Sequence, residues 1–258
     1  MLHTTITLPE TGVRLVTYLT DNQAVEPERR RPLVMLFPGG GYRVRAPREA
    51  EPVALRLLSL GIQTVIVEYA VEPVRYPQAL MEAGEAVAYA RAHAGEWLCD
   101  ENKIAVMGFS AGGHAAAHLG VRWQTLPWKE DCRPDAMILC YPVITSGEFR
   151  NDNSFRRLLG ERYDELREAV SLEKLVSEQT PPAFLWHTWD DARVPVENSL
   201  LFAAALRRAH VACEMHIDGS GRHGMSLATE EALAQGSDLM HPEYAGWIEL
   251  AARWLKGL

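Results

Sequence analysis

Short apolar runs recur along the chain, with longer and more polar stretches between them. They lie at residues 33–37, 64–67, 104–107, 136–140 and 183–186. A strand with one face in water alternates apolar and polar residues, whereas short continuous apolar runs suit strands that are buried on both faces. These runs therefore predict a mostly parallel sheet with helices on both faces.

The longer stretches carry the spacing of helices. Apolar residues recur at i, i+3, i+4, i+7 and i+8 from Leu80 to Ala88, and again from Trp247 to Leu255. Strand-like and helix-like segments alternate from about residue 33 to the end, which is typical of a doubly wound α/β sheet. Residues 4–20 alternate more regularly and predict an antiparallel hairpin at the edge of the sheet.

One segment interrupts the alternation. Residues 145–182 are charged and irregular, with helices expected around residues 155–159 and 163–170. The segment separates two predicted strands and is too long for a simple connection. Because ligands of such sheets bind at the carboxyl ends of the strands, we expect a small cap or lid over a pocket, within a single domain that spans residues 1–258. A surface excursion with no role at the pocket is the alternative.

Charge and cysteine content narrow the classes of partner. The chain has 26 basic and 34 acidic residues and a formal charge of −8, which argues against a nucleic-acid or anionic-membrane partner. No stretch approaches the roughly 20 apolar residues of a membrane span. The four cysteines are scattered without a CxxC pair, and residues 1–20 lack the pattern of a signal peptide. We therefore expect a cytoplasmic protein; its oligomeric state stays open.

The segment Gly108-Phe-Ser110-Ala-Gly112-Gly113 follows an apolar run and opens an alanine-rich helix. A G-x-S-x-G between a strand and a helix is typical of a nucleophile elbow, in which a tight turn exposes the serine hydroxyl above the sheet. The helix that follows points the positive end of its dipole at developing negative charge. Ser110 is therefore the candidate nucleophile.

A serine hydroxyl needs a base, and the chain order of this motif is Ser, then Asp or Glu, then His. His223 lies in a glycine-rich loop that follows the strand-like residues 213–217. His210 falls at a helix end, His216 falls inside the strand, and His241 is the one rival in a late loop. The acid should follow residues 183–187, where Asp190 and Asp191 are adjacent; either carboxylate could hold the imidazole.

The segment Pro38-Gly39-Gly40-Gly41-Tyr42 follows the first apolar run. Glycines let backbone N–H groups approach a tetrahedral oxyanion without obstruction by side chains. We expect the amide of Gly40 or Gly41 to donate to the oxyanion together with that of Ala111.

These segments, taken with residues 180–199 and 221–224, resemble the acetyl-esterase and acetylxylan-esterase-like branch of the α/β hydrolases. The resemblance extends from about residue 33 to the C-terminus. It implies the α/β-hydrolase fold and, from the motif D-x-x-V-P, that Asp191 rather than Asp190 is the acid. Pro38 stands where relatives of hormone-sensitive lipase carry a histidine, which places the chain nearer to enzymes of small esters and sugar esters.

The resemblance implies a carboxylesterase of short acyl esters, acetyl esters above all, with acetylated xylo-oligosaccharides among the substrates. The triad would be Ser110, Asp191 and His223, with no cofactor and no metal, and the partner would be a small-molecule ester. An arylformamidase-like amidase with the same triad is the alternative, and a non-catalytic binding protein of this fold is a third reading.

Other side chains carry weaker signals. Tyr42 and Trp189 adjoin the donor loop and the acid, and we expect both to contact substrate. His114 and His118 have a spacing that would suit a metal, but no third ligand is evident, which favours a packing role for both.

Overall fold

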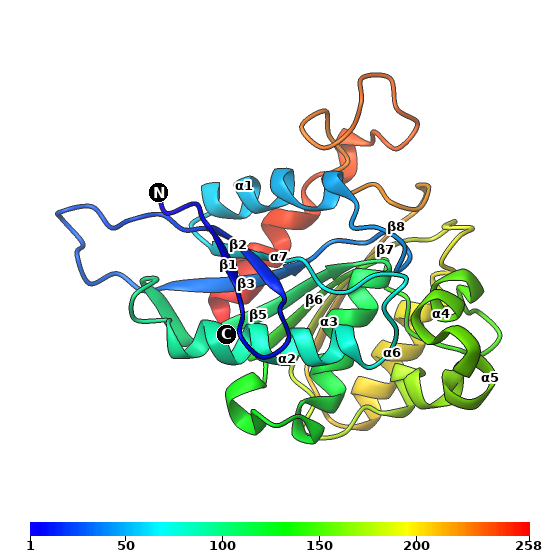
Figure 1. Ribbon diagram of the computed structural model, residues 1–258. Helices are drawn as coiled ribbons and strands as arrows, with labels where there is room; N and C mark the ends of the chain where they lie inside the picture. The colour runs from blue at the N-terminus through cyan, green and yellow to red at the C-terminus, as the bar shows by residue number, and fades with distance from the viewer.

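The computed structural model describes residues 1–258 and contains an eight-stranded sheet (Figure 1). The strand order is β1-β2-β4-β3-β5-β6-β7-β8. The pairs β1–β2 and β2–β4 are antiparallel, and every other pair is parallel. The doubly wound, mostly parallel sheet and its antiparallel edge hairpin are therefore confirmed. The strands are β1 (Thr5–Thr7), β2 (Arg14–Tyr18), β3 (Arg31–Phe37), β4 (Gln63–Val67), β5 (Cys99–Phe109), β6 (Ala136–Cys140), β7 (Ala183–Thr188) and β8 (Cys213–Asp218).

Helices cover both faces of the sheet (Figure 1). Alternate side chains of β3 explain why: Leu33 and Met35 pack on one side, Val34 and Leu36 on the other, and all four are fully buried. One face is covered by α1 (Glu51–Ser59) and α7 (Trp247–Gly257), and the other by α2 (Gln78–Ala92), α3 (Ala111–Arg122) and α6 (Glu197–Arg208).

The irregular segment 145–182 lies between β6 and β7 and contains α4 (Asp152–Leu159) and α5 (Tyr163–Leu166). The helices expected there are confirmed, the second continuing as a 3-10 turn. The side chain of Asn151 caps α4 by accepting from the backbone N–H of Ser154 at 3.0 Å. The 3-10 turns of the chain are Pro47–Glu49, Trp123–Thr125, Lys129–Cys132, Gly160–Arg162, Arg167–Val170, Leu172–Lys174 and Pro242–Tyr244.

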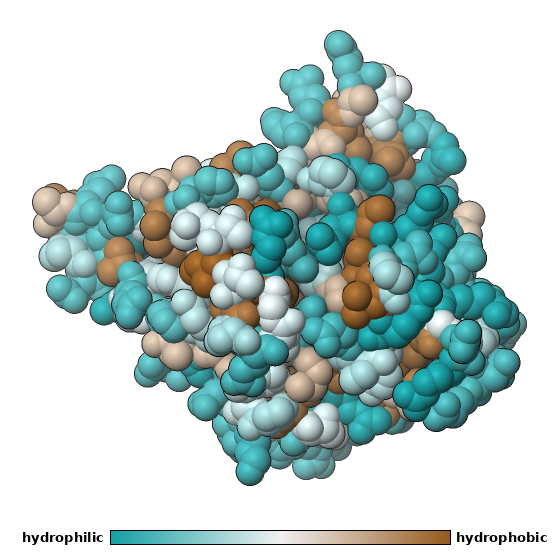
Figure 2. Space-filling model, viewed as in Figure 1, coloured by the Kyte–Doolittle hydropathy of each residue, from teal (hydrophilic) through white to brown (hydrophobic).

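The predicted chemistry collects at one edge of the sheet. Because β3, β5, β7 and β8 are parallel, the loops that follow them meet at their carboxyl ends. On the side viewed in Figure 2, apolar side chains form small separate groups among hydrophilic ones. None of the helices combines the length and the apolar character needed to cross a bilayer.

Candidate active site

Ser110 lies in the turn between β5 and α3, in a backbone conformation that non-glycine residues rarely adopt. Its φ is 52° and its ψ is −118°. The flanking glycines make this turn sterically feasible. A Cβ on Gly108 would lie 2.2 Å from the carbonyl oxygen of Gly112, and a Cβ on Gly112 would lie 2.1 Å from that of Phe37. The motif therefore has no room for side chains where it requires glycine.

His223 stands between Ser110 and Asp191 and bonds to both. Its Nε2 lies 2.8 Å from Oγ of Ser110, and its Nδ1 lies 2.6 Å from Oδ2 of Asp191. Because an ionised carboxylate only accepts hydrogen bonds, Nδ1 carries the proton and Nε2 presents its lone pair to the serine hydroxyl. This arrangement lets the imidazole remove the hydroxyl proton.

The carboxylate of Asp191 is buried, yet its surroundings keep it ionised. Its Oδ1 accepts the backbone N–H groups of Arg193 at 2.9 Å and Val194 at 3.0 Å, and Nε2 of His187 lies 3.5 Å from Oδ2. Burial raises the pKa of a carboxyl group. The nearby N–H of His187 and hydrogen bonds from His223 and the backbone outweigh it, so the pKa of Asp191 lies below its usual range. A negative charge is therefore in place beside His223.

The neighbouring Asp190 has a different role. Its Oδ1 accepts the backbone N–H of Gly221 at 2.6 Å and so ties down the loop that carries His223. The two adjacent aspartates thus have different partners: Asp191 bonds to the imidazole of His223, and Asp190 bonds to the loop that carries His223.

The glycine loop after β3 leaves two backbone donors free. The N–H of Gly39 donates to Oε2 of Glu49 at 2.8 Å, whereas those of Gly40 and Gly41 have no acceptor in the protein. Gly40 has a φ of 126°, and a Cβ there would lie 2.1 Å from the carbonyl oxygen of Val44. Gly40, Gly41 and Ser110 line a common cavity of about 580 Å³. The N–H of Ala111, at the start of α3, has no acceptor within its own helix.

A family comparison agrees with this geometry. The model of the BD-FAE family matches residues 22–206, which is well over half of the chain. The chain belongs to the BD-FAE family of α/β hydrolases.

Individual proteins resemble the chain over most of its length. The solved acetyl ester-xyloside bifunctional hydrolase from Caldicellulosiruptor lactoaceticus is 40% identical, with a TM-score of 0.84, covering 95% of this chain and 88% of that one. Endo-1,4-beta-xylanase B of Butyrivibrio fibrisolvens is 36% identical over 78% of this chain and 34% of its own length. An acetylxylan esterase of Xylanibacter ruminicola is 29% identical over 87% of this chain and 46% of its own length. The chain thus spans between a third and a half of these two curated relatives.

Two buried side chains near the triad were not predicted from the sequence. His187, in β7, donates from Nε2 to the carbonyl oxygen of Val194 at 2.9 Å, and its Nδ1 lies 2.8 Å from Oγ of Ser199. Glu49 accepts from Gly39 through Oε2 and from the hydroxyl of Tyr141 through Oε1, each at 2.8 Å. The apolar run around His187 gives no local signal, and the partners of Glu49 are far apart in sequence.

Tyr141 connects Glu49 to the histidine loop. Its ring packs edge-on against His223 with centroids 5.1 Å apart, and its hydroxyl accepts the backbone N–H of Ser226 at 2.9 Å. Burial first, and the nearby Glu49 carboxylate second, raise the pKa of Tyr141 well above its usual range. Tyr141 therefore remains a neutral donor to Glu49. One hydrogen-bonded brace thus joins the glycine loop to the loop of His223.

The expected substrate contacts of Tyr42 and Trp189 do not fall in this cavity. Tyr42 is buried, and its hydroxyl lies 2.8 Å from Nδ1 of His114, so it packs beneath the glycine loop. Trp189 is 61% exposed and does not line the cavity over Ser110. His114 and His118 pack in the core as expected, and their burial lowers the pKa of both.

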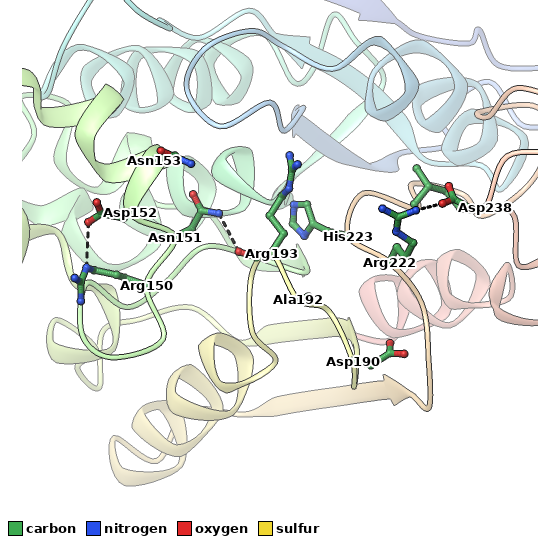
Figure 3. Close-up of a pocket in the computed structure, with 11 residues that line it drawn as sticks. Arg150, Asn151, Asp152, Asn153, Asp190, Ala192, Arg193, Arg222, His223 and Asp238 are labelled. Atoms are coloured by element: carbon green, nitrogen blue, oxygen red, sulfur yellow. Dashed lines mark hydrogen bonds and ion pairs between the residues drawn. The ribbon is translucent and has the colours of Figure 1, made fainter.

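The segment 145–182 forms one wall of the site. Asn151, Asn153, Ser154 and Arg157 line the cavity over Ser110. A neighbouring cavity of about 680 Å³ shares Asn151, Asn153, Arg193 and His223 with it (Figure 3). No group of three or more His, Cys, Asp or Glu side chains is arranged to hold a metal ion.

Proposed function

We propose that the chain is a serine carboxylesterase that hydrolyses short-chain acyl esters, mainly acetyl esters, including those of xylo-oligosaccharides. The observation that carries this proposal is the hydrogen-bonded line from Ser110 through His223 to Asp191. This line ends in a cavity that also holds the free amides of Gly40 and Gly41. The names of the relatives support acetyl groups on xylan-derived sugars as the ester.

The reaction would proceed in two halves. His223 removes the proton of Ser110 as Oγ attacks the ester carbonyl, and it then donates this proton to the leaving alcohol. Water, activated by the same imidazole, attacks the acyl-enzyme and releases the carboxylic acid. Asp191 stays ionised throughout and stabilises the imidazolium, in keeping with its lowered pKa.

The negative charge of each tetrahedral intermediate would fall on the former carbonyl oxygen. The amides of Gly40, Gly41 and Ala111 are the proposed donors, and the dipole of α3 adds to their effect. No cofactor takes part in these steps. We also infer a cytoplasmic location, because the four cysteines are scattered along the sequence without a CxxC pair, which suits a reducing compartment.

The test is hydrolysis of p-nitrophenyl esters of increasing acyl length, followed by acetate release from acetylated xylo-oligosaccharides. Wild-type protein should act fastest on the acetate. Ser110→Ala should lose on the order of 10⁴- to 10⁶-fold in turnover.

Three outcomes would contradict the proposal. Turnover that survives in Ser110→Ala would exclude this nucleophile. Wild-type protein that cleaves aryl formamides but no ester would identify an amidase, and protein that turns over neither would revive the binding-protein reading.

A further inference from the structure

The cavity over Ser110 carries positive charge although the chain as a whole is acidic. Four arginines line it, and the one carboxylate among its lining residues is Glu49. The chain has a formal charge of −8, so this concentration of cations runs against the average of the molecule. The lining arginines are Arg43, Arg48, Arg157 and Arg193.

The nearby carboxylates occupy few of the N–H donors of these arginines. Nη2 of Arg48 lies 3.8 Å from Glu49. Nε of Arg43 and Nε of Arg157 each lie 3.9 Å from Glu72, whose one carboxylate is shared between them. These separations exceed the length of a hydrogen bond, and a guanidinium has five N–H donors.

Arg193 has even fewer partners. Its exposed side chain forms no ion pair and no side-chain hydrogen bond, and it extends beside His223 (Figure 3). Several N–H groups of this cluster are therefore available to a ligand.

Two of the guanidinium groups flank the reacting centre. Nη1 of Arg157 donates to the carbonyl oxygen of Gly41 at 3.3 Å, in the proposed oxyanion loop. Nε of Arg48 donates at 2.8 Å to the carbonyl oxygen of Gly224, the residue after His223. The positive charge therefore lies beside both loops that would hold the ester.

The neighbouring cavity shows that this charge is not a general property of the surface. There Arg150 pairs with Asp152 at 3.1 Å, and Arg222 pairs with Asp238 (Figure 3). With Asp190 and Arg193 included, its lining has three arginines and three aspartates and no net charge. The cavity that contains the serine therefore has an excess of arginine that this neighbouring cavity lacks.

We propose that the natural ester carries a carboxylate on its alcohol side: an acetylated oligosaccharide that contains a sugar acid. This inference rests on the proposed esterase function. The planar fork of arginine pairs with a carboxylate through two parallel hydrogen bonds. The amides of Asn151 and Asn153 in the same wall are suited to sugar hydroxyls. An acetyl group has no charge of its own, so the alcohol must supply the anion.

The experiment compares kcat/KM for acetylated xylo-oligosaccharides of equal length with and without a uronic acid, at low and high ionic strength. The acidic substrate should be preferred by about tenfold at low salt, since a hydrogen-bonded charge pair contributes this much. The preference should shrink as salt screens the charges.

The matched variants are Arg193→Gln and Arg208→Gln. Both remove one positive charge, but Arg208 lies exposed at the end of α6 and outside the cavity. Arg193→Gln should lower the preference several-fold through a higher KM for the acidic substrate, and Arg208→Gln should leave the preference unchanged.

Three results would overturn the inference. Equal kcat/KM for acidic and neutral oligosaccharides would do so while leaving the esterase function intact. A preference for p-nitrophenyl hemisuccinate over the acetate, without one for the acidic sugar, would put the carboxylate on the acyl side. If no ester were hydrolysed, the proposed function would fail. Equal binding of deacetylated acidic and neutral oligosaccharides in calorimetry would then overturn the inference as well.

Discussion

Glu49 is the buried residue whose replacement tests the architecture of the site most directly. Its carboxylate is almost fully buried, at 1% exposure for the residue, and accepts two hydrogen bonds of 2.8 Å, from Gly39 and Tyr141. In Glu49→Gln a single carbonyl oxygen remains, which cannot reach both donors. The hydroxyl of Tyr141 already accepts the backbone N–H of Ser226. The NH2 group that replaces the second oxygen would therefore face a hydroxyl with little acceptor capacity left.

The magnitude follows from these two bonds. Hydrogen bonds to a charged group contribute about 1.5–3 kcal/mol each. Losing one and weakening the other should therefore destabilise the brace by about 2 kcal/mol. Because Gly39 adjoins the free amides of Gly40 and Gly41, the glycine loop should lose its alignment. If the full 2 kcal/mol is expressed in the transition state, kcat falls on the order of 30-fold.

The assay is steady-state hydrolysis of p-nitrophenyl acetate, together with urea unfolding of each variant. We expect a lower kcat, a KM close to that of wild type and a lower free energy of unfolding. Tyr141→Phe removes one arm of the brace, and the double variant should show coupling of 0.5–3 kcal/mol, as is common for residues in contact.

Three results would refute the reasoning. Wild-type kcat and stability in Glu49→Gln would mean that the brace contributes nothing. Lower stability with unchanged kcat would limit Glu49 to a structural role. A higher kcat would mean that the buried negative charge opposes the oxyanion more than its hydrogen bonds align the loop.

Three further predictions concern the fold around the site. Gly112→Ala should not yield folded protein by circular dichroism, because its Cβ would lie 2.1 Å from a backbone oxygen, whereas Gly95→Ala, with nothing within 4 Å, should fold normally. Burial lowers the pKa of His114 to about 4, so its contribution to stability is complete above the ordinary imidazole pKa of about 6.5 and is lost as pH falls toward 4. Urea unfolding at pH values in this window should show that the free energy of unfolding falls by up to about 3 kcal/mol because of this residue. In His114→Gln the free energy of unfolding should depend less steeply on pH. Asp190→Ala should lower kcat for p-nitrophenyl acetate several-fold, because the loop of His223 loses its bond at Gly221, while Asp190→Asn, which keeps an acceptor, should lose less; equal losses would contradict this role.

The sheet could be predicted because its strands are buried on both faces. Fully apolar runs mark such strands whatever their partners are, and each run in the sequence became a strand. The boundaries were less accurate: β5 begins at Cys99 rather than at residue 104, since its first residues are polar and its pairing is decided by the neighbouring β3. Helix α1 has no mark as clear as the periodicity of α2 and α7.

The meeting of Ser110 with His223 could also be predicted from the sequence, because each of the two motifs depends on a few adjacent residues. The glycines around Ser110 are required by contacts within the same turn, and the loop of His223 follows directly from its strand. The choice between Asp190 and Asp191 needed a resemblance to relatives, since both carboxylates occupy equivalent local surroundings. Their different partners, Gly221 and His223, come from another loop.

Only the tertiary structure decided which distant side chains meet. Glu49 and Tyr141 are 92 residues apart and share one hydrogen bond, and no local pattern joins them. The arginines of the cavity come from three separate segments, each unremarkable within an acidic chain. Tyr42 adjoins the glycine loop in sequence, yet its φ of 57° accompanies a side chain packed in the core rather than in the cavity. Periodicity and turn chemistry act over a few adjacent residues and can therefore be predicted from the sequence. Burial, charge and hydrogen bonding across the site depend on how the loops of different strands pack together, so only the tertiary structure decides them.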